Sequence, residues 1–216
     1  MSQIILDMSS GNTCRNDKAI VKQMIDAIKA IDTGKHSIVL KWQLSLDDGI
    51  NVPLDHDVFE YAYKYGNELG YKTTSSVADL ESLKFLLQYD PCLVKIPNDR
   101  KLDYLIGEVP RKIPVYVSVG SMSEGGLFLY RHPDYINQNR DIALYCVSQY
   151  PSIIEEYEGR FSKGSLKHGI SDHTIGLDLF KKYQPQIWEK HFRLINSTGL
   201  DAGPFAITPD ELREIL

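Results

Sequence analysis

Short apolar segments rich in β-branched residues alternate along the chain with longer segments of helical periodicity. Between residues 16 and 31 apolar residues recur every three or four positions, which predicts a helix whose buried face holds Ile20, Val21, Met24, Ile25, Ile28 and Ile31. Further helices are predicted around 58–69, 79–88 and 102–109. The strand pattern occurs in eight segments, which span residues 3–10, 37–43, 72–76, 92–97, 113–120, 141–148, 166–172 and 185–191. This alternation is typical of parallel α/β folds.

A last helix is predicted at TPDELREIL, residues 208–216. Thr208 suits the N-cap, Pro209 is compatible with the first helical position, and Glu211 completes a capping box. The strand–helix units follow one another without a linker. We therefore predict a single domain over residues 1–216, a small closed (β/α)₈ TIM barrel of the α/β class. An open doubly wound sheet is the structural alternative.

The composition narrows the class of partners. The 216 residues carry a net charge of −5 with no block of Lys or Arg, so a nucleic-acid partner is not expected. No segment approaches the roughly 20 apolar residues of a membrane span, so a membrane partner is not expected either. Cys14, Cys92 and Cys146 form no CxxC pair, which favours a reducing compartment and a cytoplasmic location.

Polar side chains gather where the predicted strands end, which is where a TIM barrel carries its chemistry. Lys41 in VLKWQ and Lys95 in LVKIP lie in segments that should be buried, and a buried charge is costly unless it is paired. We therefore expect the two lysines to meet a phosphate or a carboxylate, although a lone lysine at a strand end often only reaches the surface. The stretch GSMSEGG at 120–126 could cradle phosphate, but it lacks a Walker pattern and is interpreted as a loop.

Two histidines form the candidate metal site. His173 and His191 each follow a short apolar strand and have an acidic residue nearby. Adjacent parallel strands end at the same edge, so the two imidazoles could share one Mn²⁺, Fe²⁺ or Zn²⁺ and leave positions for water or substrate. For either histidine alone, a hydrogen-bonded structural role is the alternative.

Several motifs resemble those of the sialic acid synthase family. The most specific are GISDHT at 169–174, WEKHF at 188–192 and GLDAGPFAITPDEL at 199–212. Earlier segments are similar in the same order, namely VLKWQ at 39–43, SSVADLESLKFL at 75–86, VKIP at 94–97, VYVSVG at 115–120 and YCVSQYP at 145–151. The resemblance runs along nearly the whole chain.

The resemblance implies condensation of phosphoenolpyruvate with an aldehyde sugar such as N-acetylmannosamine, with a divalent metal, most often Mn²⁺, and release of phosphate. His173 and His191 would hold the metal, so His173 counts as catalytic. Because Arg100 stands where the family has a proton-transferring Glu, proton transfer would fall to Asp7, Asp99, Asp201 or a metal-bound water. The residues expected to bind phosphoenolpyruvate or the sugar are Lys41, Gln43, Ser75, Lys95, Ser118, Ser148, Tyr150, Ser171 and Asp201. A homodimer is a further expectation.

The sequence departs from the family pattern at positions expected to contact the sugar or to transfer protons. The family has Glu at the position of Arg100, Ser at that of Asn98 and Glu at that of Asp7, and it continues past residue 216 into an antifreeze-like domain. A guanidinium stays protonated and cannot act as a general base. The alternative function is therefore a degenerate barrel that binds a metal or a small anion, or serves as a partner subunit. A Schiff-base aldolase would instead need Lys41 or Lys95 unpaired in an apolar pocket.

Overall fold

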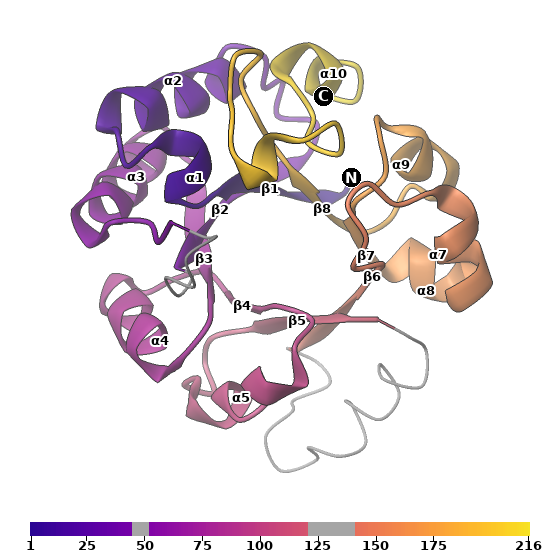
Figure 1. Cartoon of the computed structure of the whole chain (residues 1–216), viewed down its shortest axis with the longest axis horizontal. Helices are drawn as coiled ribbons and strands as arrows, with labels where there is room; N and C mark the ends of the chain where they lie inside the picture. The colour runs from indigo at the N-terminus through magenta and orange to yellow at the C-terminus, as the bar shows by residue number, and fades with distance from the viewer. Residues whose placement is uncertain (45–51, 121–140) are drawn as a thin grey trace.

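Eight parallel strands close into a barrel in the computed structural model, which describes residues 1–44, 52–120 and 141–216 (Figure 1). Each strand pairs with the next one along the chain, and β8 returns to β1. The strands are β1 (Gln3–Ser9), β2 (Ser37–Leu44), β3 (Lys72–Val77), β4 (Val94–Ile96), β5 (Val115–Val119), β6 (Ile142–Cys146), β7 (Gly169–Asp172) and β8 (Ile187–His191). The predicted (β/α)₈ barrel is confirmed, and the open sheet is excluded.

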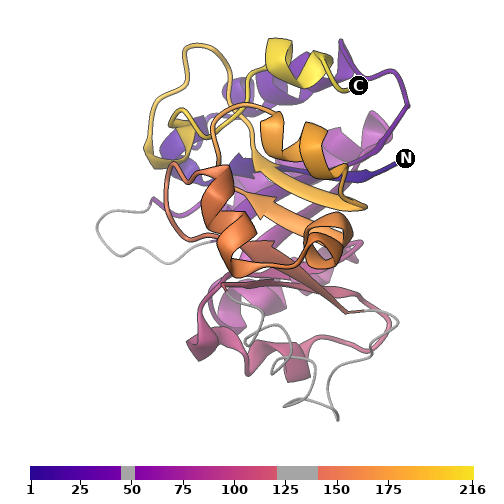
Figure 2. The same cartoon turned by 90° about the vertical axis from the view of Figure 1, so that its right-hand side faces the viewer.

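Helices cover the outside of the barrel (Figures 1 and 2). The described α-helices are α1 (Gly11–Cys14), α2 (Lys18–Lys29), α3 (His56–Glu68), α4 (Leu80–Leu86), α5 (Leu105–Glu108), α7 (Ile154–Arg160), α8 (Lys163–His168), α9 (Asp178–Tyr183) and α10 (Pro209–Arg213). Three short 3₁₀ helices are η1 (Leu87–Tyr89), η2 (Arg100–Leu102) and η3 (Leu200–Ala202).

Local sequence explains where two of these helices begin. The side chain of Asp17 accepts a hydrogen bond from the backbone N–H of Ala19, so α2 begins at residue 18. In α10, Thr208 Oγ1 accepts from Glu211 N at 3.4 Å, and Glu211 Oε2 accepts from Thr208 N at 2.8 Å. The predicted capping box at the last helix is therefore confirmed.

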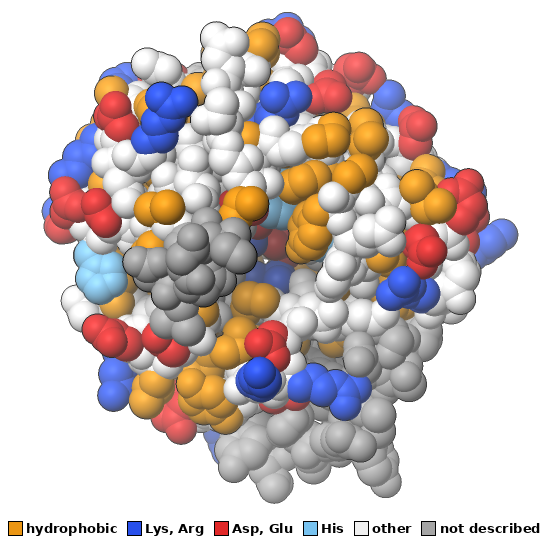
Figure 3. All heavy atoms as spheres, viewed as in Figure 1, with side chains coloured by type: hydrophobic (Ala, Val, Ile, Leu, Met, Phe, Trp, Pro, Cys, Tyr) orange, Lys and Arg blue, Asp and Glu red, His pale blue; other side chains and the backbone are white. Residues whose placement is uncertain are grey.

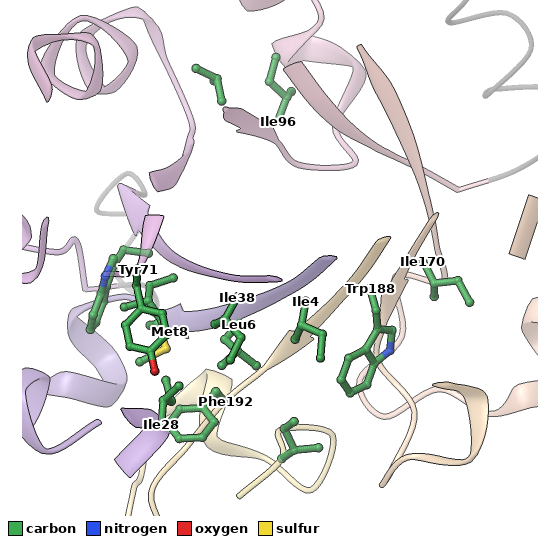
Figure 4. Packing of buried hydrophobic residues seen from close by; sticks show 14 of the residues in the cluster. Ile4, Leu6, Met8, Ile28, Ile38, Tyr71, Ile96, Ile170, Trp188 and Phe192 are labelled. Atoms are coloured by element: carbon green, nitrogen blue, oxygen red, sulfur yellow. The ribbon is translucent and has the colours of Figure 1, made fainter. Parts of the chain in front are cut away.

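Successive residues of each strand alternate between the helix side and the barrel interior. On β1, Leu6 and Met8 belong to the large core between barrel and helices, on the same side as Ile28 of α2 (Figure 4). Full burial of such a side chain contributes about 1.5–3 kcal/mol. A second, smaller apolar cluster lies on the opposite faces of the strands and consists of Ile5, Val39, Leu93, Tyr116, Leu144 and Ile187.

Six strands, β1 and β4 to β8, are shorter than predicted. β7 begins at Gly169 because residues 163–168 form α8, in which Ser162 Oγ accepts from Ser165 N at 3.1 Å and Leu166 is buried. β4 is limited to Val94–Ile96. The GSMSEGG stretch lies outside the described residues from position 121 onward. Among the helices of the described ranges, none is long and apolar enough to cross a membrane.

Candidate active site at the C-terminal end of the barrel

The inward positions of the strands change from apolar to charged toward the C-terminal ends. Side chains two residues apart on a strand point to the same side. At four strands an apolar inward residue is followed, two positions later, by a charged one. These successive inward residues are Ile5 and Asp7 on β1, Val39 and Lys41 on β2, Leu93 and Lys95 at β4, and Ile187 and Glu189 on β8. The apolar layer therefore forms a floor beneath a polar layer.

A cavity of about 310 Å³ opens above this polar layer. Figure 3 shows a hollow at the centre of the face seen in Figure 1, with basic and histidine side chains inside it. The residues that line the cavity are Asp7, Lys41, Gln43, Ser76, Lys95, Pro97, Asn98, Ser118, Cys146, Ser148, Tyr150, Ser171, His173, Glu189, His191 and Asp201. Its position is the one at which TIM barrels carry their active sites.

Lys41 is held by two carboxylates. Its Nζ lies 2.5 Å from Asp7 Oδ2 and 2.7 Å from Glu189 Oε1, and all three side chains are buried. Gln43 Nε2 donates to both oxygens of Asp7, at 3.1 and 3.0 Å. Burial alone would raise the pKa of Asp7, but the charge of Lys41 and these hydrogen bonds bring it well below its ordinary value. Lys41 is therefore already neutralised by the protein.

The charge of Lys95 is compensated less completely by nearby carboxylates than that of Lys41. Lys95 Nζ donates to Ser118 Oγ at 2.7 Å and to Ile96 O at 3.2 Å, and the nearest carboxylate oxygen of the described residues, Glu189 Oε2, lies 3.5 Å away. That Glu189 oxygen is buried and finds no hydrogen-bond partner within residues 1–44, 52–120 and 141–216. Burial and the charge of Lys41 lower the pKa of Lys95, and the carboxylate of Glu189 only partly opposes this. Of the two lysines, Lys95 has the greater capacity to bind an incoming anion. Neither lysine lies unpaired in an apolar pocket, as a Schiff-base aldolase would require.

His173 lines the cavity, and its imidazole ring is bound to the backbone through Nδ1. Nδ1 lies 2.7 Å from Val147 O, and because a carbonyl can only accept, Nδ1 carries a proton. Burial lowers the pKa of His173 to about 4, and the neighbouring His191 contributes to the shift. The centroids of the two imidazole rings are 5.7 Å apart.

His191 lies between two carboxylates, and its Nδ1 has no hydrogen-bond partner among the described residues. Nδ1 is 3.5 Å from Asp7 Oδ2 and 3.7 Å from Asp201 Oδ1. In the part of the chain that the structure describes, Asp201 Oδ2 is likewise buried without a hydrogen-bond partner. Burial raises the pKa of Asp201 above its ordinary value. The ring of Tyr150 lies 4.1 Å from that of His173, centroid to centroid, and covers one side of the pair. Buried polar groups that lack partners here are available to a ligand.

The same alternation sends two other motif residues to the outside of the barrel. Lys190 Nζ lies 3.2 Å from Asp172 Oδ1 and donates to Thr174 O at 2.6 Å. Trp188 Nε1 donates to Asp172 Oδ2 at 2.9 Å. The ion pair is fully buried, so it anchors the segment that follows β7 and carries His173. In the motifs SDHT and EKHF, Asp172 and Lys190 are therefore structural.

By themselves the two histidines supply only some of the ligands that a metal ion needs. Within the described residues, no group of three or more His, Cys, Asp or Glu side chains is placed to hold an ion. His173 and His191 offer two imidazole nitrogens, and a carbonyl partner at Nδ1 of His173 is the arrangement that orients metal-binding histidines. A metal here would take its other ligands from water or substrate.

The structure brings together most of the residues expected from the sequence, but it places two elsewhere. The Oγ of Ser75 donates to Trp42 O at 2.9 Å and accepts from Leu44 N at 3.0 Å, and the neighbouring Ser76 lines the cavity instead. Asp99 is exposed, and its side chain accepts from Lys101 N at the start of η2, outside the cavity lining. Arg100 is likewise exposed and outside the lining.

Sequence reasoning did not count Glu189 among the site residues. The signal was present, since Glu189 precedes His191 by two residues in a strand and must therefore share its face. Cys146 and Asn98 also line the cavity, and Asn98 Nδ2 donates to Ser148 Oγ at 3.0 Å.

Comparison with known proteins identifies the family. The model of the NeuB family matches residues 45–216. The chain belongs to the NeuB family. A search of the curated proteins found no match. The matched range contains GISDHT and WEKHF, which confirms the resemblance to the sialic acid synthases.

Solved structures similar to this NeuB-family chain share its fold at low sequence identity. One is the spore coat polysaccharide biosynthesis protein spsE of Bacillus subtilis, with a TM-score of 0.76 and 18% identity over 99% of this chain and 65% of that one. A second is the N-acetylneuraminic acid synthetase of Leptospira borgpetersenii in complex with citrate, at 0.72 and 19%, covering 98% and 80%. A third is a putative spore coat polysaccharide biosynthesis protein E of Chromobacterium violaceum, at 0.72 and 15%, covering 99% and 72%.

Proposed function

We propose that this chain condenses phosphoenolpyruvate with an aldehyde sugar and releases phosphate, as a metal-dependent synthase of the sialic acid synthase type. The observation that carries the proposal is the cavity of this NeuB-family barrel, which is lined by Lys95, able to bind a further anion, and by the imidazoles of His173 and His191. The named activity of the Leptospira neighbour, a sialic acid synthetase, agrees with this class of reaction.

The anion would bind on the side of Lys95. Lys95 and Ser118 are already in contact, and both line the cavity together with Ser171. An ammonium supplies charge and hydroxyls supply directed donors, the combination that suits a phosphate or a carboxylate. Lys41 would act mainly by keeping Asp7 and Glu189 ionised and in place.

His173 and His191 would hold a divalent ion, for which Mn²⁺ is the best candidate because imidazole, water and substrate oxygens suit it. The ion, when bound, would polarise the aldehyde oxygen as a Lewis acid. The neutral state of His173 supports this role, because a protonated imidazole has no lone pair to give.

The sugar would occupy the open side of the cavity, against Gln43, Ser148, Tyr150 and Asp201. In the reaction, C3 of phosphoenolpyruvate forms a bond with the aldehyde carbon, water adds to C2, and the bond between C2 and the phosphate oxygen breaks. The added water loses both protons as its oxygen becomes the C2 carbonyl: one goes to the new hydroxyl, and the other leaves with the phosphate. Asp201, whose pKa is raised by burial, is the lining carboxyl best suited to carry such a proton.

The test is phosphate release from phosphoenolpyruvate in the presence of Mn²⁺, measured with N-acetylmannosamine and a panel of related aldehyde sugars. Release that requires both Mn²⁺ and an aldehyde supports the proposal, and His173→Ala serves as the inactive control. Absence of release with every aldehyde, together with a thermal shift by phosphoenolpyruvate, would favour the anion-binding barrel instead.

A further inference from the structure

The strand that precedes His173 loses its neighbour just before the histidine. β6 and β7 pair only at Tyr145 with Ile170 and at Cys146 with Ser171. In a parallel ladder the main-chain groups of alternate residues face the same neighbouring strand, so Ser171 and His173 both face the β6 side. Beyond Cys146 the chain leaves the barrel, and a partner for the next main-chain groups must come from elsewhere.

The hydroxyl of Tyr157 takes the place of the missing strand. Tyr157 is the fully buried residue of α7, and its hydroxyl donates to Ser171 O at 2.7 Å and accepts from His173 N at 3.0 Å. Only a group that both donates and accepts can bridge a carbonyl and an N–H in this way. The two bridged groups belong to residues whose side chains line the cavity.

The same segment of the chain holds His173 at two further points. Val147 O accepts from the imidazole Nδ1 at 2.7 Å, and Ser152 N donates to His173 O at 2.9 Å. The ring, the N–H and the carbonyl of His173 are thus all bound by residues between 147 and 157. Of these three contacts, the one from Tyr157 is the only one made by a side chain, so a substitution can remove it without changing the main chain.

We propose that Tyr157 is a positioning residue, whose hydroxyl sets the backbone between Ser171 and His173 and thereby aims both side chains into the cavity. The inference concerns the geometry of the site, and only its effect on metal binding rests on the proposed function. A purely structural tyrosine would also satisfy two buried main-chain groups, but its loss would not change the environment of the His173 ring.

The experiment compares Tyr157→Phe with Tyr116→Phe. Tyr116 is also buried, but its hydroxyl donates to Gln3 Oε1 at 3.0 Å, at the opposite end of the barrel. With ¹⁵N-labelled histidine, the side-chain signals of His173 should shift in Tyr157→Phe and stay unchanged in Tyr116→Phe. Mn²⁺ affinity measured by calorimetry should fall by about 10–100-fold in Tyr157→Phe alone, the usual effect of removing a group that orients a ligand.

Unchanged His173 signals in a folded Tyr157→Phe variant would overturn the proposal, even if the melting temperature fell. If the natural protein binds no Mn²⁺, the metal part of the proposed function fails, while the histidine signals still decide the positioning role. If Tyr157→Phe does not fold, hydrogen exchange on the natural protein decides. A slowly exchanging His173 amide with a cross-peak to the Tyr157 hydroxyl proton is expected, and a rapidly exchanging amide would refute the contact.

Discussion

Lys41 and Lys95 are equally buried and line the same cavity, yet replacing them by methionine should affect different properties of the protein. Lys41→Met removes the cation that pairs with Asp7 at 2.5 Å and Glu189 at 2.7 Å. Lys95→Met removes a hydrogen bond to Ser118 and a carboxylate contact at 3.5 Å. We expect the first variant to lose stability and the second to lose anion binding.

The magnitudes follow from the contacts. Removing one partner of a buried ion pair costs about 3–5 kcal/mol, because a buried charge is left uncompensated. Glu189 keeps Lys95 at 3.5 Å, so we expect the lower end for Lys41→Met, about 3 kcal/mol. For a chain of this length that lowers the melting temperature by about 6–12 °C. Lys95→Met removes a cation whose burial is itself unfavourable, so its melting temperature should change by no more than about 3 °C.

Thermal unfolding with and without phosphoenolpyruvate measures both effects. A ligand at a hundredfold excess over its Kd stabilises the native state by about 2.7 kcal/mol, which corresponds to about 5–10 °C here. The natural protein should show this shift, and Lys95→Met should lose most of it. The same melting-temperature shift is measured with inorganic phosphate as a second ligand. If Lys41→Met melts like the natural protein, or if Lys95→Met keeps the full shift, the assignment of the two lysines is wrong.

Three further outcomes are expected. His173→Ala combined with His191→Ala should abolish Mn²⁺ binding in calorimetry while the far-ultraviolet spectrum is unchanged; unaltered binding would mean that both histidines are structural. In the folded chain without metal the pKa of His173 is lowered from 6.5 to about 4. As the pH falls through this range, the unfolded chain therefore takes up the proton before the folded chain does. Stability should therefore decline between pH 6.5 and 4 by at most about 3 kcal/mol, and His173→Ala should flatten that decline. Lys190→Met removes the cation that pairs with the buried Asp172 and should lower the melting temperature, yet keep the phosphoenolpyruvate shift, because this ion pair lies outside the cavity. Loss of the shift in a folded Lys190→Met variant would contradict that placement.

Much of the fold could be predicted from local patterns, since alternation of strand and helix segments depends on residues close in sequence. The capping box of Thr208 and Glu211 is such a local feature, and the structure has it. Boundaries were less predictable where a segment suits two structures. Leu166 fits the start of a strand, but Ser162 caps a helix there, so β7 begins at Gly169.

The candidate site could be predicted in part for the same reason. Motifs placed His173, His191, Lys41 and Lys95 at strand ends, and the barrel brings these ends together. β3 reads KTTSSV, with hydroxyls on both faces, so its sequence could not tell whether Ser75 or Ser76 faces inward. Asp99 has the right chemistry but lies in an exposed turn.

The sequence by itself determined the eight strand segments, the residue types available at their ends and the family to which the chain belongs. The tertiary structure alone decided which of these residues meet. Lys41 pairs with Asp7, 34 positions away, and with Glu189, 148 positions away, because the barrel closes between β8 and β1. A side-chain charge has the same value wherever it stands in the sequence, but burial and the distance to its neighbours set its pKa and its free capacity to bind. That is why two similar lysines were equivalent in the sequence and are different in the folded chain.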